Sequence, residues 1–112
     1  MNLGVVEQLR HNYLKAAFYF KILIELNSSN PEGYYALAKM YSDNNQNQLA
    51  YKNGILAERF YKETNSPYIG NCYYLLCVIT INLNNKLEAK KYSQLAKSRG
   101  IKIPKQIDDI LE

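Results

Sequence analysis

The sequence predicts an all-α fold in which residues 1–112 form one domain of stacked, antiparallel helix hairpins. Strand-like alternation does not persist anywhere, and the expected turns are so short that neighbouring helices must run antiparallel. Helical apolar patterns also repeat, because Ala16 and Ala50 lie 34 residues apart at equivalent places and Ala89 marks a third copy. A chain of this length has room for a single core.

Apolar periodicity, with polar turns between the periodic segments, predicts about seven helices. Residues 10–12 are expected to form the first turn. Asn30-Pro31 and Ser66-Pro67 are expected helix starts, since proline at the first helical position loses no hydrogen bond and Asn and Ser are good N-caps. The expected helices are residues 2–11, 13–28, 31–43, 46–64, 67–83, 86–98 and 104–111.

The second predicted repeat carries the clearest motif. Its motif residues are Tyr34, Leu37, Ala38, Tyr41, Ala50 and Ala57. They resemble the tetratricopeptide repeat, in which small residues let two helices approach and large ones fill the space between hairpins. Gly54 stands where an aromatic residue is usual, and we expect it to allow a close helix contact rather than to leave an open slot. The resemblance implies a right-handed α-solenoid with repeats at about 1–30, 31–66 and 67–103 and a capping helix at 104–112.

The other two repeats match less well. The first begins late and has Glu7 where an aromatic residue is usual; its matching residues are Leu3, Gly4, Tyr13, Ala16, Phe20, Leu23 and Leu26. In the third, Thr80 and Ser93 replace large residues; its matching residues are Tyr73, Leu76, Cys77, Asn84 at the turn, Ala89 and Ala96. The late start also fits the C-terminal part of a longer protein.

Members of this family bind peptides or partner helices in a concave groove formed by the first helix of each hairpin. By position, the resemblance implies the groove residues Val5, Gln8, Tyr35, Lys39, Ser42, Tyr74, Val78, Ile81 and Asn82. Within the tyrosine pairs, Tyr34 and Tyr73 are expected in the core and Tyr35 and Tyr74 in the groove, because neighbours on a helix point about 100° apart.

A protein or peptide partner of unknown identity is therefore the expected ligand, and the function expected is that of a binding scaffold. The repeat count also resembles that of small secretion chaperones, so a chaperone-like role is one form of this hypothesis. Lys39 and Asn82 suggest a carboxylate clamp of the kind some relatives use, but Tyr35 and Tyr74 lie where such a clamp needs basic and amide residues.

Self-association is the alternative hypothesis. Because the first repeat begins late, the apolar residues Leu3, Val6 and Leu9 are expected to be poorly covered. Repeat arrays with exposed apolar ends tend to associate, so this hypothesis predicts a homodimer.

Catalysis, cofactors and metals find little support in the sequence, which has no nucleophile, phosphate-loop or zinc motif. His11 is the only histidine and is expected in an exposed turn, and Cys72 and Cys77 are expected to be buried and reduced. Asp108, Asp109 and Glu112 are expected to form a solvated acidic tip.

The net charge of +4 is concentrated near the C-terminus. Seven of the fourteen basic residues are Lys86, Lys90, Lys91, Lys97, Arg99, Lys102 and Lys105. A solvated face is favoured over a partner site there, and nucleic acid is not expected because no recognition motif accompanies the charge. No apolar run is long enough to span a membrane and no signal peptide is evident, so a cytoplasmic protein without a membrane partner is expected.

Overall fold

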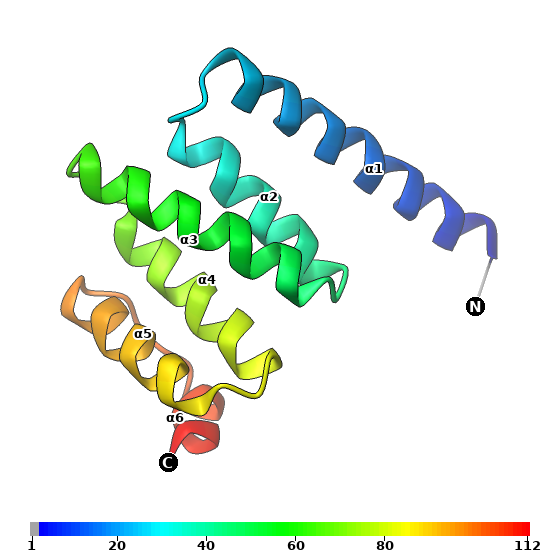
Figure 1. The fold of residues 1–112 in the computed structure, drawn as a ribbon. Helices are drawn as coiled ribbons and strands as arrows, with labels where there is room; N and C mark the ends of the chain where they lie inside the picture. Colours follow the sequence, from blue (N-terminus) through cyan, green and yellow to red (C-terminus); the bar gives the residue numbers. More distant parts are fainter. Residues whose placement is uncertain (1–2) are drawn as a thin grey trace.

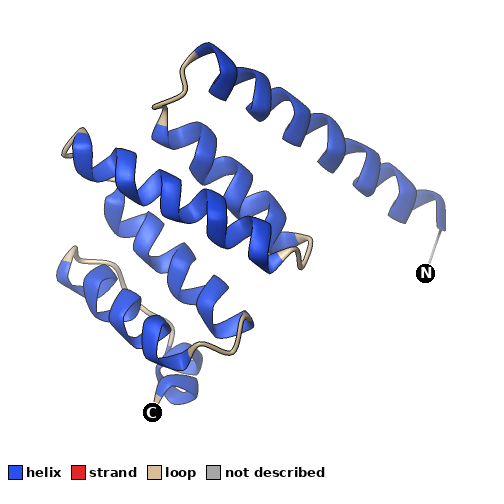
Figure 2. Ribbon diagram, in the orientation of Figure 1, coloured by secondary structure: helices blue, strands red, loops and turns tan. Residues whose placement is uncertain are grey.

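The computed structural model describes the backbone of residues 3–112 and the side chains of residues 14–112, and these residues form α-helices and no strand (Figures 1 and 2). The helices are α1 (Leu3–Leu26), α2 (Pro31–Asp43), α3 (Asn47–Glu63), α4 (Ile69–Asn82), α5 (Lys86–Ser98) and α6 (Lys105–Leu111). Six helices are therefore described where about seven were expected. The all-α class is confirmed.

The difference lies at the N-terminus, where the predicted turn at residues 10–12 does not form. The backbone is helical through His11, so the two helices expected at 2–11 and 13–28 are one helix, α1. The turns that follow α2, α3 and α4 each contain an asparagine with positive φ, namely Asn45, Asn65 and Asn84. Arg10-His11-Asn12 is polar but contains neither glycine nor proline, so nothing forces the helix to end there.

The other boundaries agree closely with the prediction. Helices α2 and α5 have the predicted bounds, and the Asn30 side chain accepts a hydrogen bond from the Glu32 N–H at 3.0 Å, as expected of an N-cap. The prediction that α4 begins at Pro67 was wrong. Residues 67 and 68 form a turn, in which the Ser66 hydroxyl accepts from the Tyr68 N–H at 3.1 Å, and the helix begins at Ile69.

Helices adjacent in sequence pack against one another (Figure 1). Helix α2 packs along α3, and α4 packs along α5. Contacts between α3 and α4 join these two pairs, and the short α6 lies against α5. Small residues line these contacts with no solvent exposure: Ala38, Ala50, Ala57, Cys72, Cys77, Ala89 and Ala96. In α1 the buried small residue is Ala17, whereas Ala16 is half-buried.

Gly54 lies at a close contact of α3 with α4 and α2. A β-carbon added there would lie 2.7 Å from Leu76 Cδ2 and 3.8 Å from Ala38 Cβ. Leu76 and Ala38 are fully buried. The expectation of a close helix contact at this glycine is confirmed.

Helix α1 extends well beyond the helix it packs on (Figure 1). At a rise of about 1.5 Å per residue, its 24 residues span about 36 Å and the 13 of α2 about 20 Å. Ala17, Phe20 and Ile24 pack into the core formed with α2, α3 and α4. Among the described residues, no helix combines the length and apolarity that crossing a membrane requires.

Candidate protein-interaction surface

A hollow rich in tyrosine lies where α2, α3 and α4 meet. Its volume is about 230 Å³ and its lining is mostly apolar. Five side chains line this tyrosine hollow: Glu32, Tyr35, Tyr61, Tyr68 and Asn71. It is open to solvent, so it is a surface feature that a partner can reach rather than a sealed cavity.

Local sequence places these side chains. The Asn30 cap fixes the start of α2, which puts Glu32 and Tyr35 in its first two turns. Tyr61 lies in the last turn of α3, and Asn65, with φ 53°, lies in the turn that follows this helix. The turn at residues 66–68 then leaves Tyr68 60% exposed at the rim.

The rings of Tyr35 and Tyr61 form one corner of the hollow. Their centroids are 6.3 Å apart and their planes meet at 72°, an edge-to-face contact. Burial raises the pKa of both hydroxyls above 10.0, and the nearby Glu32 charge raises the pKa of Tyr61 further. Both tyrosines are therefore neutral at physiological pH, and the formal charge in the hollow is that of Glu32.

The predicted groove residues fall on α1, α2 and α4. On α2, Tyr35 and Ser42 are half-buried and Lys39 is exposed; on α4, Tyr74, Val78 and Ile81 are half-buried and Asn82 is exposed. Val5 and Gln8 lie in α1, and their side chains are outside the described residues. Tyr35 is the one predicted groove residue with a described side chain that lines the tyrosine hollow. The continuous groove along α2 and α4 therefore stays a prediction.

The sequence prediction missed the other four residues of the tyrosine hollow. Tyr61 is 3% exposed and reads as a core residue in α3. Tyr68 and Asn71 were assigned to a helix beginning at Pro67, which hid the turn that brings Tyr68 to the rim. The Ser66-Pro67 dipeptide was the available signal, because it is as typical of a turn as of a helix start.

Tyr34 and Tyr73 were expected in the core. Tyr73 is buried and stacks on Tyr92, with centroids 6.2 Å apart. Tyr34 is only half-buried: it stacks on Phe60 at 5.4 Å, and its hydroxyl donates to the Ser28 carbonyl at 2.8 Å.

A second surface is apolar and belongs to α1. An exposed row runs along this helix at four-residue spacing: Leu14, Phe18, Ile22 and Leu26. Next to it are two open hollows of about 390 and 440 Å³, in which α1 faces Tyr41 of α2 and Leu49 of α3. Exposed large apolar side chains gathered on one face are typical of interaction sites.

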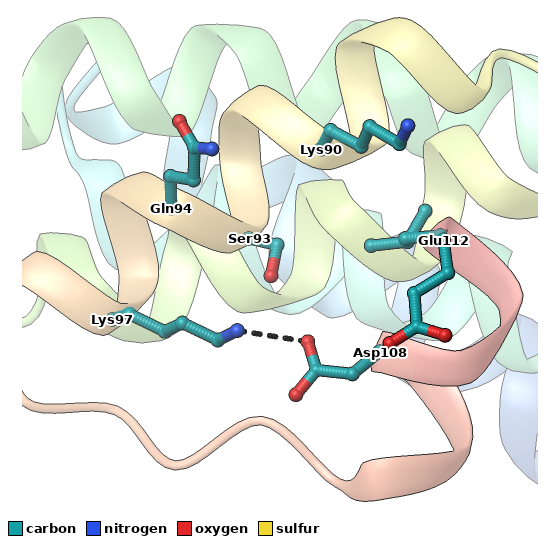
Figure 3. A pocket seen from close by; sticks show the side chains of 7 residues that line it. Lys90, Ser93, Gln94, Lys97, Asp108 and Glu112 are labelled. Carbon is teal, nitrogen blue, oxygen red and sulfur yellow. Dashed lines mark hydrogen bonds and ion pairs between the residues drawn. The ribbon is translucent and has the colours of Figure 1, made fainter.

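A third hollow, of about 370 Å³, lies between α5 and α6 (Figure 3). Its lining residues are Lys90, Ser93, Gln94, Lys97, Asp108, Leu111 and Glu112. Lys97 Nζ donates to Asp108 Oδ1 at 2.8 Å, so one cation of the hollow is already paired. Two cations and two carboxylates give this hollow no net preference for an anion, although all seven basic residues predicted near the C-terminus are exposed.

Two buried thiols and the partly buried hydroxyl of Tyr51 lie within the contacts between helices. Cys72 and Cys77 are buried and free, and burial raises the pKa of Cys72 to about 12, so the thiol is protonated at neutral pH. The Tyr51 hydroxyl donates to Glu88 Oε1 at 2.5 Å and links α3 to α5, which raises the pKa of Tyr51 to about 12.

Three features within residues 14–112 are accessible to a partner: the acidic, tyrosine-lined hollow, the apolar face of α1 and the basic C-terminal region. Comparison with models of protein families, with curated proteins and with solved structures gives no match in any of the three.

Proposed function

We propose that this chain is a protein-binding scaffold of the tetratricopeptide kind, which holds a peptide or a partner helix along α2 and α4. The observation that carries the proposal is the tyrosine hollow at the end of this surface. Tyr35 lines this hollow, and both Tyr35 and Tyr74, the tyrosines predicted for the groove, are half-buried on α2 and α4. Tyrosine suits such a surface because it offers a large contact area, few rotatable bonds and a hydroxyl for directional hydrogen bonds.

The repeat-like packing supports the helix-stack part of the proposal. Ala38 of α2 and Cys77 of α4 lie 39 residues apart, and both are fully buried. Asn45 and Asn84, the positive-φ asparagines in the turns after these two helices, are also 39 residues apart. A buried small residue and a turn residue that recur at one spacing are expected of equivalent positions in stacked repeats.

The first prediction concerns capture of a partner. A Tyr35→Ala, Lys39→Glu, Tyr74→Ala variant should retain at least about tenfold less of a partner that the wild-type protein captures from native lysate, because truncating one hot-spot tyrosine costs about 2 kcal/mol of binding free energy. Retention is measured by quantitative mass spectrometry after circular dichroism has shown that the variant is helical.

The matched control makes three substitutions with the same net charge change on α5, namely Leu87→Ala, Lys90→Glu and Gln94→Ala. These three side chains are exposed and lie away from the tyrosine hollow. The control variant should retain the partner. Equal loss from both variants would count against the α2 and α4 surface.

Self-association is the second candidate function, and the apolar row on α1 favours it. Phe18 is 67% exposed and Leu26 is 79% exposed, and the four-residue spacing makes the row a ridge that can pack against an identical ridge. A two-fold axis near residue 20 would place Leu14 opposite Leu26 and Phe18 opposite Ile22 of a second copy.

The second prediction follows from this arrangement. If α1 pairs with a second copy, the wild-type protein is a dimer in light scattering coupled to gel filtration, and Phe18→Glu makes it a monomer because two carboxylates would be buried at the centre of the contact. Leu87→Glu, at another exposed leucine, should leave the dimer intact. A wild-type protein that is monomeric at every concentration removes this candidate.

A further inference from the structure

We propose that the tyrosine hollow binds a basic side chain, arginine or lysine, of the partner. This inference rests on the proposed function and deepens it, because it names the chemical class of residue that the surface selects. The hollow combines one carboxylate with three aromatic rings, and both kinds of group attract a cation.

The carboxylate of Glu32 has no cationic partner within the described part of the chain. Ion pairs among residues 14–112 join Arg59 to Glu63, Lys62 to Glu58 and Lys97 to Asp108, and none involves Glu32. No basic side chain lines the hollow either. Its formal charge is therefore −1, although the chain as a whole carries +4. An acidic site on a basic protein points to a cation that comes from outside.

The rings supply the second attraction. Elsewhere in the molecule, basic side chains of the chain itself lie over aromatic rings: Arg59 Cζ is 5.8 Å from the centre of the Phe60 ring, and Lys91 Nζ is 5.6 Å from that of Tyr92. Within residues 14–112, no such cation lies over Tyr35, Tyr61 or Tyr68. The exposed Tyr68 ring and the half-buried Tyr35 ring are accessible to a cation from a partner, and the buried Tyr61 ring forms a corner with Tyr35 at the base of the hollow.

The size of the hollow favours one side chain over a whole small molecule. Its volume of about 230 Å³ lies below the roughly 300–1,000 Å³ of small-molecule pockets. The polar atoms suit the same ligand, because the Glu32 carboxylate, the tyrosine hydroxyls and the Asn71 side-chain carbonyl can accept the N–H groups of a guanidinium or an ammonium group. An acidic or phosphorylated side chain would instead meet the charge of Glu32 directly.

The test uses capped amino acids as probes and the isotope-labelled full chain. N-acetyl-arginine amide and N-acetyl-lysine amide should shift the ring resonances of Tyr35, Tyr61 and Tyr68 and the side-chain amide of Asn71 in a saturable way. N-acetyl-citrulline amide, which has nearly the shape of arginine but no charge, should bind at least about fivefold more weakly. Citrulline binding as tightly as arginine, or shifts that fall outside these residues, would overturn the proposal.

Two variants complete the test. Glu32→Gln should reduce the preference for arginine over citrulline at least about threefold, with the rest supplied by the rings. Tyr68→Ala should weaken binding of the arginine probe at least about threefold, since the exposed Tyr68 ring can be removed without opening the core. Glu112→Gln, which makes the same charge change just after α6, should have no effect. A partner captured equally by wild type and Glu32→Gln, but lost from the α2 and α4 variant, would reject the cation site and retain the proposed function.

Discussion

Gly54→Leu is expected to lower the free energy of unfolding by about 3 kcal/mol. The added β-carbon would already lie 2.7 Å from Leu76 Cδ2, and the remaining carbon atoms of the new side chain have no solvent-facing direction because Ala38, Ala50 and Ala57 around it are fully buried. A better helix propensity returns only about 1 kcal/mol. For a domain whose total stability is about 5–15 kcal/mol, the loss is large.

Chemical denaturation followed by circular dichroism measures this change, and a size-swap variant identifies its cause. Leu76→Ala alone should cost about 2–5 kcal/mol because it leaves a cavity in the core. Combined with Gly54→Leu, it should cost clearly less than the sum of the two, since one leucine then fills the space of the other. An unchanged denaturation midpoint for Gly54→Leu would mean that the position is open rather than packed.

The protein is expected to lose stability steeply above pH 9. The folded state raises the pKa of Cys72 from 9.0 to about 12 and that of Tyr51 from 10.0 to about 12, and it raises the pKa of Tyr61 and Tyr92 as well. Burial is the main cause, except at Tyr51, where the hydrogen bond to Glu88 comes first. These groups bind their protons more tightly when folded, so their contribution is complete below pH 9 and is lost as the pH rises from 9 through 12.

Thermal denaturation at pH 8, 10 and 11 measures this loss, and absorbance of tyrosinate at 295 nm should show a group of tyrosines that ionise only as the protein unfolds. Tyr51→Phe should flatten the decline between pH 10 and 12, because it removes one of the shifted groups. A melting temperature that is the same at pH 8 and pH 11 would contradict the account of these buried hydroxyls.

The helices could be predicted from sequence wherever a local signal marks both ends. Helix α2 has a capping asparagine, a proline at its first position and an asparagine turn after it, and its predicted bounds were correct. The prediction of a turn at Arg10-His11-Asn12 was wrong. Three consecutive polar residues occur both on an exposed helix face and in a turn, and this segment has no glycine or proline that would indicate a turn. Gly54 was interpreted correctly, since a glycine within a helix needs a packing reason.

The candidate site was harder to predict, because its residues are brought together by three helices and a turn. Helix position was enough to place Tyr35 on an accessible face. It was not enough to show that Tyr61, a core residue by its pattern, also lines the hollow, or that Tyr68 leaves the helix and reaches the rim. The position of Glu32 in this hollow could not be predicted either, because in the sequence it is one of ten acidic residues with nothing to distinguish it.

The central claim is that the surface of α2 and α4 holds a different protein, and photo-crosslinking from position 39 tests it most directly. Lys39 is exposed on α2, and Lys90 is exposed on α5, so replacing either with benzoylphenylalanine should leave the core intact. The account predicts that position 39 forms an adduct with another protein in native lysate and that position 90 does not. Equal adducts from both positions, or an adduct from position 39 that contains only a second copy of this chain, would contradict it.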